Sequence, residues 1–154
     1  MAPNYQPLSS TVKMVEIQQL YGLVRKYASA SPPEGQWNKL EQSLFIDSIW
    51  NHYPMNPLVF RIVGDGPDAK IICIDGNERL SAIKSFIDGT IPWIDSCSPF
   101  GQQWWYDCRS DLSVTDMVLT KSQQAAFEST RLSCTFVRHL SEVQAEEIVR
   151  RLRH

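Results

Sequence analysis

The chain has 154 residues, a formal net charge of −2 and 43% hydrophobic residues. These values exclude disorder of the whole chain and a protein that coats nucleic acid by its overall positive charge. The length suits one domain over residues 1–154, and we expect residues 1–12 of it to be flexible. No apolar run approaches the roughly 20 residues of a membrane span, so we expect no membrane partner.

The N-terminal third predicts two helices joined by a loop. Apolar residues at helical spacing predict the first helix over residues 14–27, and the Ser-, Pro- and Gly-rich residues 28–35 predict the loop. Asn38 with Glu41 three residues later is typical of a capping box and predicts a second helix over residues 39–52. The side chains expected to face the core from this second helix are Leu40, Leu44, Phe45 and Ile49.

The middle of the chain predicts a hairpin followed by a helix. Residues 58–63 and 70–74 are short apolar strands, and the turn-forming residues 64–68 between them make an antiparallel pair plausible. The second of these strands is continuously apolar, so we expect it to be central in the sheet. The following helix has a buried stripe and a left-handed glycine cap at its end, given by Leu80, Ile83, Ile87 and Gly89.

The C-terminal part begins with an aromatic segment, which is followed by predicted helices and a strand. Residues 91–106 are irregular and rich in aromatic side chains, Thr120 with Gln123 predicts a short helix to about Ser129, and residues 132–137 predict a strand. Ser141 with Gln144 begins the last predicted helix. Helices and strands that alternate in this way indicate an α+β fold with a small mixed sheet packed by helices.

The most informative segment is a strand, a tight turn and a helix over residues 71–86. Gly76 permits backbone angles closed to other residues, and the unpaired amides at the helix start form an anion site. Arg79 adds a planar fork of donors suited to phosphate, while Asp75 and Glu78 could hold a divalent ion or act as a general base. A purely structural interpretation is also open, in which Asp75 caps the helix, Glu78 favours its dipole and Arg79 pairs with a carboxylate.

Several motifs resemble the ParB/sulfiredoxin-like superfamily, and most closely the N-terminal domain of GmrSD-type restriction endonucleases. The segment Asp75–Leu80 resembles the motif Asp-Gly-Gln-Gln-Arg-Leu, and Trp37 followed by Leu44–Ile49 resembles a Trp and then a helix containing Leu-Ile-Asp-Ser-Ile. The Pro-rich entry at Tyr53–Leu58 and the helix end at Val149–Leu152 are similar to further family segments. The match spans about residues 15–152, and Cys73–Gly76 resembles the fungal branch.

The resemblance implies a compact ParB/sulfiredoxin-type fold that binds a nucleotide or a nucleic-acid phosphate at the turn. Family members are associated with NTP hydrolysis, CTP-dependent switching and DNA cleavage. The residues that would then bind phosphate are Gly76, Asn77, Arg79 and Ser81. Asn77 stands where the sulfiredoxin branch has its catalytic cysteine, so thiol chemistry is not expected at the turn.

Two departures from the family pattern bear on catalysis. The family has Gln-Arg shortly before its Trp, whereas residues 31–36 contain no arginine. Glu78 replaces a glutamine and adds negative charge beside the expected phosphate; at ~4 Å and an effective dielectric near 20, two like charges repel by about 4 kcal/mol. A divalent ion, Mg²⁺ or Mn²⁺, held by Asp75 and Glu78 would reverse that sign.

Other side chains have alternative interpretations. Asp47, on a helix that faces the core, either contacts the site or bonds to backbone, and the lone His52 suits a surface or capping role. Trp104, Trp105 and Tyr106 either stack on bases or pack into the core. The basic C-terminus either contacts a nucleic-acid backbone or forms a solvated helix face, and its members are Arg150, Arg151, Arg153 and His154. The candidate nucleic-acid contacts are Trp37, Arg138 and His139.

The leading hypothesis is a metal-dependent nuclease, with DNA as the expected substrate. Asp75, Glu78 and Arg79 would be its catalytic residues. The alternatives are a nucleotide-binding or NTP-hydrolysing switch without nuclease activity and a non-catalytic interaction domain.

The cysteines indicate the compartment. None of the four forms a Cys-x-x-Cys pair, which argues against a zinc ribbon or a thioredoxin-like motif. Cys73 and Cys134 lie in apolar, strand-like runs and are expected to be buried free thiols. Together with an N-terminus that has no secretory signal, this favours an intracellular location, cytoplasmic or nuclear.

Overall fold

The computed structural model describes residues 8–27 and 37–152, and it has an α+β fold. Contacts within the chain divide it into two compact units. The sheet unit comprises residues 1–15, 56–76 and 132–154, and the helical unit comprises residues 16–55 and 77–131. The expectation of a single domain stays a prediction.

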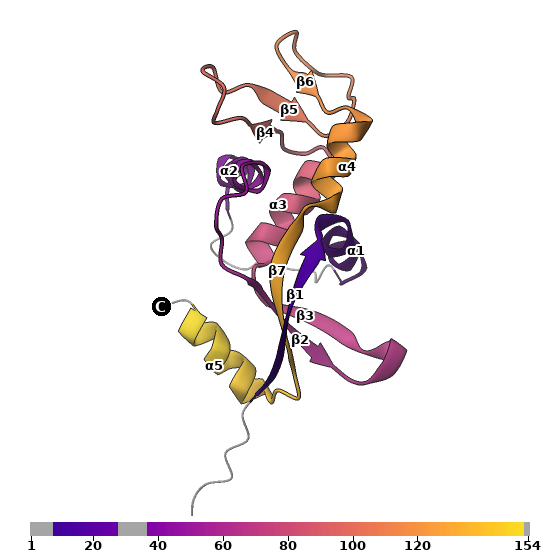
Figure 1. Ribbon diagram of the computed structural model, residues 1–154, viewed down its shortest axis with the longest axis vertical. Helices are drawn as coiled ribbons and strands as arrows, with labels where there is room; N and C mark the ends of the chain where they lie inside the picture. The colour runs from indigo at the N-terminus through magenta and orange to yellow at the C-terminus, as the bar shows by residue number, and fades with distance from the viewer. Residues whose placement is uncertain (1–7, 28–36, 153–154) are drawn as a thin grey trace, which may run out of the picture. The chain divides into compact units, whose positions relative to one another are not determined.

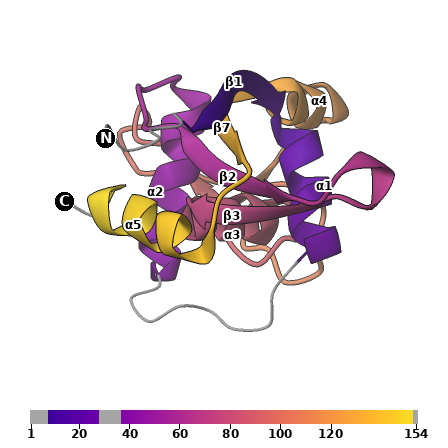
Figure 2. The same ribbon diagram turned by 90° about the horizontal axis from the view of Figure 1, so that it is seen from below.

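The sheet unit is built on four strands in the order β1-β7-β2-β3, with one helix, α5 (Figures 1 and 2). Its elements are β1 (Ser9–Glu16), β2 (Leu58–Val63), a 3₁₀ turn η1 (Gly66–Asp68), β3 (Lys70–Asp75), β7 (Arg131–Arg138) and α5 (Glu142–Leu152). The predicted hairpin is confirmed, because β2 and β3 pair antiparallel from Val63 opposite Lys70 to Val59 opposite Asp75. β2 also pairs with β7, in parallel.

β3 lies at an edge of this sheet, so the expectation of a central strand is wrong. Its apolar composition has another cause, since α5 packs against β3 within the unit. The edge is still partly open to solvent, and Ile72 is 45% exposed. An apolar strand can therefore be covered by a helix instead of by a second strand neighbour.

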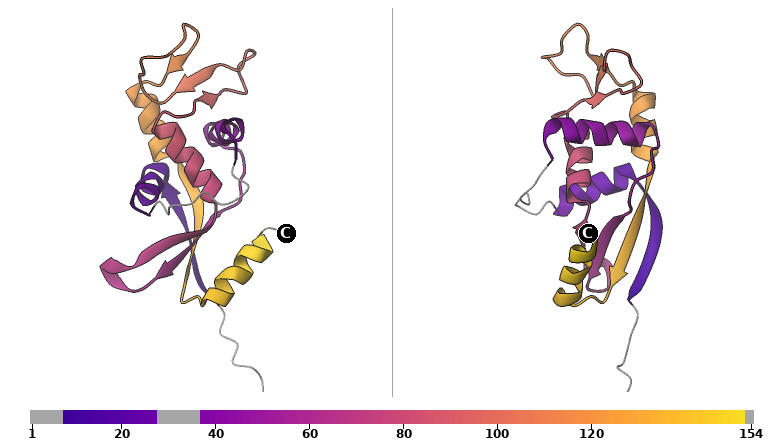
Figure 3. Two further views of the ribbon diagram at one scale, coloured as in Figure 1. Left: turned by 180° about the vertical axis from the view of Figure 1, so that it is seen from behind. Right: turned by 90° about the vertical axis from the view of Figure 1, so that its left-hand side faces the viewer.

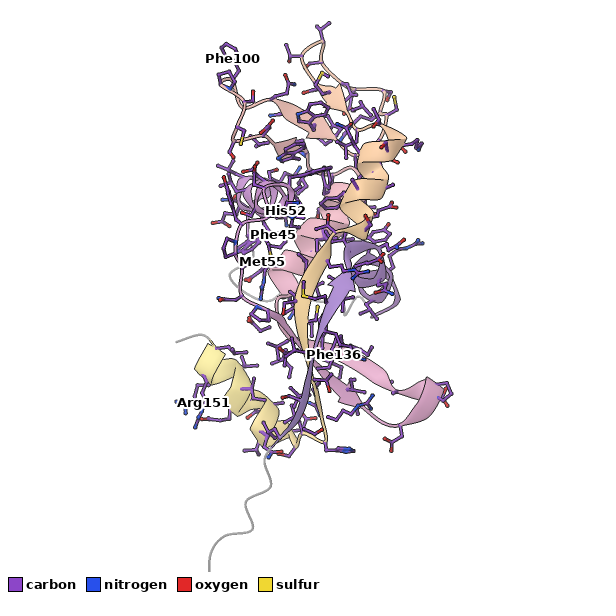
Figure 4. The ribbon with its side chains drawn as sticks, viewed as in Figure 1. Phe45, His52, Met55, Phe100, Phe136 and Arg151 are labelled. Carbon is purple, nitrogen blue, oxygen red and sulfur yellow. The ribbon has the colours of Figure 1, made fainter. Side chains whose placement is uncertain are left out.

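The core of the sheet unit lies over the first half of β2 and the middle of β7. Leu58, Phe60 and Cys134 are almost fully buried. The rings of Phe60 and Phe136 stack with centroids 5.3 Å apart, and the Lys13 ammonium lies 5.9 Å from the Phe136 ring centroid (Figure 4). Stacked aromatic pairs on adjacent strands stabilise a sheet beyond their burial.

In the described part of the helical unit there are four helices and a small three-stranded sheet (Figure 3). Its elements are α1 (Ile17–Tyr27), α2 (Lys39–Trp50), α3 (Asn77–Ile87), β4 (Trp93–Ile94), β5 (Gln103–Trp105), β6 (Met117–Val118) and α4 (Lys121–Ser129). Helix α3 packs against both α1 and α2. The fully buried side chains include Ile17, Leu20, Ile46, Ile83, Phe86 and Phe127.

An aromatic stack runs from the small sheet into this core. Trp104 lies 5.9 Å from Trp93, Trp93 4.7 Å from Trp50, and Trp50 5.5 Å from Phe127, all measured between ring centroids. Tyr106 is buried and meets Phe86 edge-on. These contacts favour the packing interpretation of the aromatic segment over base stacking.

Two sequence-based expectations about the helices are wrong. Residues 14–16 belong to β1, because the apolar stripe of α1 begins only at Ile17. On α2, Leu40 and Leu44 are 57% and 49% exposed, while Ser43 and Asp47 are buried. The face of α2 that packs is therefore set by the neighbouring elements and not by the position of its leucines alone.

The predictions made from residues at the helix ends agree with the structure better than those about buried helix faces. The predicted capping box at Asn38 with Glu41 forms, and the helix predicted to begin at Thr120 with Gln123 also begins with a capping box. Gly89 ends α3 with a φ of +81°, as expected for a left-handed cap. Among the residues that the structure describes, no helix has the length and apolarity needed to cross a bilayer.

Candidate functional site

The turn between β3 and α3 has the local structure that the sequence predicts. β3 ends at Asp75, Gly76 has a φ of +121°, and α3 begins directly at Asn77. This φ lies in the region where a side chain is strained, so the chain needs glycine here. The boundary between the two units falls between Gly76 and Asn77.

Four predicted site residues lie in the first turns of α3. They are Asn77, Glu78, Arg79 and Ser81. Asn77 is exposed, and Glu78, Arg79 and Ser81 are half-buried. The helix has 11 residues, so its first amides and its dipole give a positive partial charge where these polar side chains begin.

Asp75 and Gly76 belong to the other unit, at the end of β3. Asp75 is the last residue of the strand and lies opposite Val59 of β2, next to a register shift at Val59 and Phe60. Asp75 is half-buried and Gly76 is buried. The chain thus brings an acidic strand end, a glycine turn and a basic first helical turn together in sequence.

A metal site would depend on Asp75 and Glu78. The described residues contain no group of three or more His, Cys, Asp or Glu side chains placed to hold an ion. Mg²⁺ at phosphate-transfer sites usually takes one or two protein carboxylates and completes its shell with water and substrate phosphate. In number and type, the two carboxylates fit that mode of binding.

Arg138 and His139 lie away from the turn, at the opposite end of the hairpin. They line a pocket of about 140 Å³ in the sheet unit together with residues 61–65 at the end of β2. His139 has a φ of +61° and links β7 to α5. Sequence reasoning did not identify Arg61, although a lone charge inside the apolar run 58–63 was a signal that it has a specific partner.

Trp37 packs inside the helical unit. Its ring lies 5.6 Å from that of Phe45 at a tilted angle, and the side chain is half-buried. This ring contact with Phe45 accounts for the partial burial of Trp37, which lies just before the start of α2. Its expected role in nucleic-acid contact stays a prediction.

Asp47 is a structural anchor. It is 4% exposed and its carboxylate accepts hydrogen bonds from Trp93 Nε1 at 2.9 Å, Asn51 Nδ2 at 3.0 Å and the Ser96 amide at 3.2 Å. Burial raises the pKa of Asp47, but these donors outweigh it and hold the pKa below its ordinary value. Of the two alternatives for Asp47, backbone and side-chain bonding is the one observed.

The remaining candidates lie at element ends. His52 is exposed after α2 with a φ of +53°, which agrees with the expected surface role (Figure 4). Arg150 and Arg151 are exposed and both bond to Glu147, which favours a solvated helix face. Arg153, His154 and the stretch 31–36 without arginine lie outside the described residues.

All four cysteines are free thiols. Cys134 is buried as expected, whereas Cys73 is only half-buried because β3 lies at the sheet edge. Cys97 and Cys108 are exposed.

Comparisons of the chain with known protein families, with curated proteins and with solved structures found no match.

Proposed function

We propose that the protein binds phosphate groups of a nucleic acid or nucleotide at the start of α3 and hydrolyses phosphodiester bonds there. The observation that supports this most is the turn itself, in which Gly76 adopts a φ of +121° immediately before an 11-residue helix. A backbone of this kind lets a phosphate approach the first helical amides closely. The resemblance of Asp75–Leu80 to the ParB/sulfiredoxin-like motif supports the same interpretation.

Each residue has a distinct task in this proposal. The amides from Asn77 onward and the Arg79 guanidinium stabilise negative charge on the phosphate. The hydroxyl of Ser81, one turn after Asn77, adds a neutral donor on the same helix face. Asp75 and Glu78 would hold a divalent ion, which when bound supplies Lewis-acid activation of the phosphate.

Plasmid cleavage tests the proposal. Supercoiled DNA is incubated with the protein in Mg²⁺, Mn²⁺ or EDTA, alongside Glu78→Ala, Arg79→Ala and the control Lys84→Ala. Lys84 lies on the same helix but pairs with Asp88 at 2.6 Å in the last turn. We expect metal-dependent cutting in the wild type and in Lys84→Ala, and its loss in the other two. Equal cutting in Arg79→Ala would refute a role for this turn.

A second candidate is a nucleotide-binding switch without nuclease activity. The absence of an arginine from positions 31–36 of the sequence and the net charge of −2 favour it, because both reduce the positive charge available to hold a nucleic-acid backbone. Binding of a fluorescent nucleotide that is lost in Arg79→Ala, with plasmid left intact under every metal condition, would support this candidate and contradict the first.

A further inference from the structure

Strand β1 forms an open edge of the four-stranded sheet. Among the strands that the structure describes, its one neighbour is β7, which lies on one side of it (Figure 2). Proteins usually protect such an edge with a proline, a bulge or several charges, because its free amides and carbonyls pair readily with another strand. Residues 9–15 contain no proline and no glycine and carry one charge, on Lys13, so this edge is able to accept a further strand.

The backbone groups that face the open edge belong to alternate residues of β1. Directly after the strand, the Ile17 amide donates to the carbonyl of Thr130, which directly precedes β7, at 2.9 Å. Successive residues of a strand turn their amides and carbonyls to opposite sides, so the odd-numbered residues that follow the direction of Ile17 face β7. The amides and carbonyls of the residues between them, Ser10, Val12 and Met14, are therefore directed at the open edge.

Two exposed apolar side chains lie beside the same edge. Val12 is 66% exposed and Met14 is 59% exposed, and residues two apart in a strand lie on the same face of the sheet. Lys13 lies on the other face, where its ammonium is 5.9 Å from the ring centroid of Phe136. Val12 and Met14 therefore lie on the face opposite the stacked pair of Phe136 and Phe60. Apolar side chains next to an open strand edge are typical of a surface that another chain covers.

We propose that β1 pairs antiparallel with β1 of a second copy of this chain, about a two-fold axis at Val12. The charge on the strand selects this register, because like charges directly opposite each other destabilise a strand pair. Centring on Val12 places Lys13 opposite Thr11 of the second copy, whereas centring on Lys13 would place two ammonium groups opposite each other. The Val12 register also joins the edge-facing amides and carbonyls of both strands and gathers Val12 and Met14 of both copies into one apolar patch.

The size of the strand edge sets the expected strength of this dimer. Eight residues at ~3.4 Å each give an edge of about 27 Å, and a sheet layer ~10 Å thick then gives a contact of about 270 Å² per copy. A stable protein interface buries about 800 Å² per partner. The dimer is therefore weak and reversible, and its population rises with protein concentration.

Sedimentation equilibrium over a series of protein concentrations tests the proposal. We expect the wild type to pass from monomer to dimer as the concentration rises. Val12→Lys should weaken the self-association at least tenfold, because it places two ammonium groups opposite each other at the two-fold axis. The matched control is Val143→Lys, the same change at a 75% exposed position of α5, which should dimerise as the wild type does. Far-ultraviolet circular dichroism of each variant confirms that the fold is retained.

A mixture of Val12→Lys and Val12→Glu tests the register itself. Each variant alone should remain monomeric, and the mixture should form a heterodimer, because opposite charges then meet at the two-fold axis. Arg79→Ala should dimerise as the wild type does, so the result is independent of the α3 turn. A wild type that is monomeric at every concentration, equal self-association of Val12→Lys and Val143→Lys, or a mixture that stays monomeric would overturn the proposal.

Discussion

Replacing Asp47 with alanine should destabilise the helical unit strongly. The change removes the acceptor for the Trp93 indole N–H, the Ser96 amide and one bond of the Asn51 side chain. Asn51 keeps its second bond, to the Asp47 carbonyl at 2.9 Å. Two donors therefore lose their acceptor, and at about 1–3 kcal/mol each the free energy of unfolding should fall by about 2–6 kcal/mol.

Urea denaturation followed by tryptophan fluorescence measures this loss. All five tryptophans belong to the helical unit, so the signal reports on that unit. The matched control is Ser48→Ala on the same helix, which removes only a bond to the Leu44 carbonyl at 3.2 Å and should cost about 1 kcal/mol or less. A loss for Asp47→Ala no larger than that for Ser48→Ala would refute the anchoring role.

The pH dependence of the wild type gives an independent check on Asp47. Its folded-state pKa is depressed, because the three donors outweigh burial. The stabilisation is therefore fully present above the unfolded-state pKa of about 3.9 and is lost as the pH falls through the lower folded-state value. Asp47→Ala should lack this part of the acid sensitivity.

Three further outcomes are expected. Gly76→Ala should lower the free energy of unfolding, measured by urea denaturation, by about 1–3 kcal/mol because of the φ of +121°. Gly22→Ala in α1, where the Cβ position has open space, should leave the free energy of unfolding unchanged or raise it, and equal effects of the two changes would contradict the strain argument. In an NMR titration, Arg150 and Arg151 should hold the pKa of Glu147 at about 2, and Arg150→Gln/Arg151→Gln should return it toward 4.5; a normal wild-type pKa would show that these pairs do not persist. A thiol reagent should modify Cys97 and Cys108 rapidly and Cys134 only on unfolding, and fast labelling of Cys134 would contradict its burial.

The parts of the fold that could be predicted are those encoded locally. A capping box needs two residues three apart, and Asn38 with Glu41 forms one whatever the rest of the chain does. The hairpin of β2 and β3 was predictable for the same reason, since its turn residues adjoin the strands they connect.

The missed features depend on distant partners. β1 is exposed over most of its length, and its neighbour in the sheet is β7, which begins at Arg131, more than 100 residues after β1 ends at Glu16. β4 and β6 have two residues each, too few for any periodic signal. The buried face of α2 includes Asp47, whose hydrogen-bond partners Trp93 and Ser96 are 46 and 49 residues away, so the sequence of the helix alone did not predict which face is buried.

The candidate site divides in the same way. The strand, glycine and helix of residues 70–87 form one continuous segment, and their order was predictable. The pocket lined by residues 61–65 and 138–140 was not predictable, because Arg61 and Arg138 come from strands that are neighbours only in the folded sheet. A charged residue inside an apolar strand indicated a partner, but only the fold identifies which residues surround it.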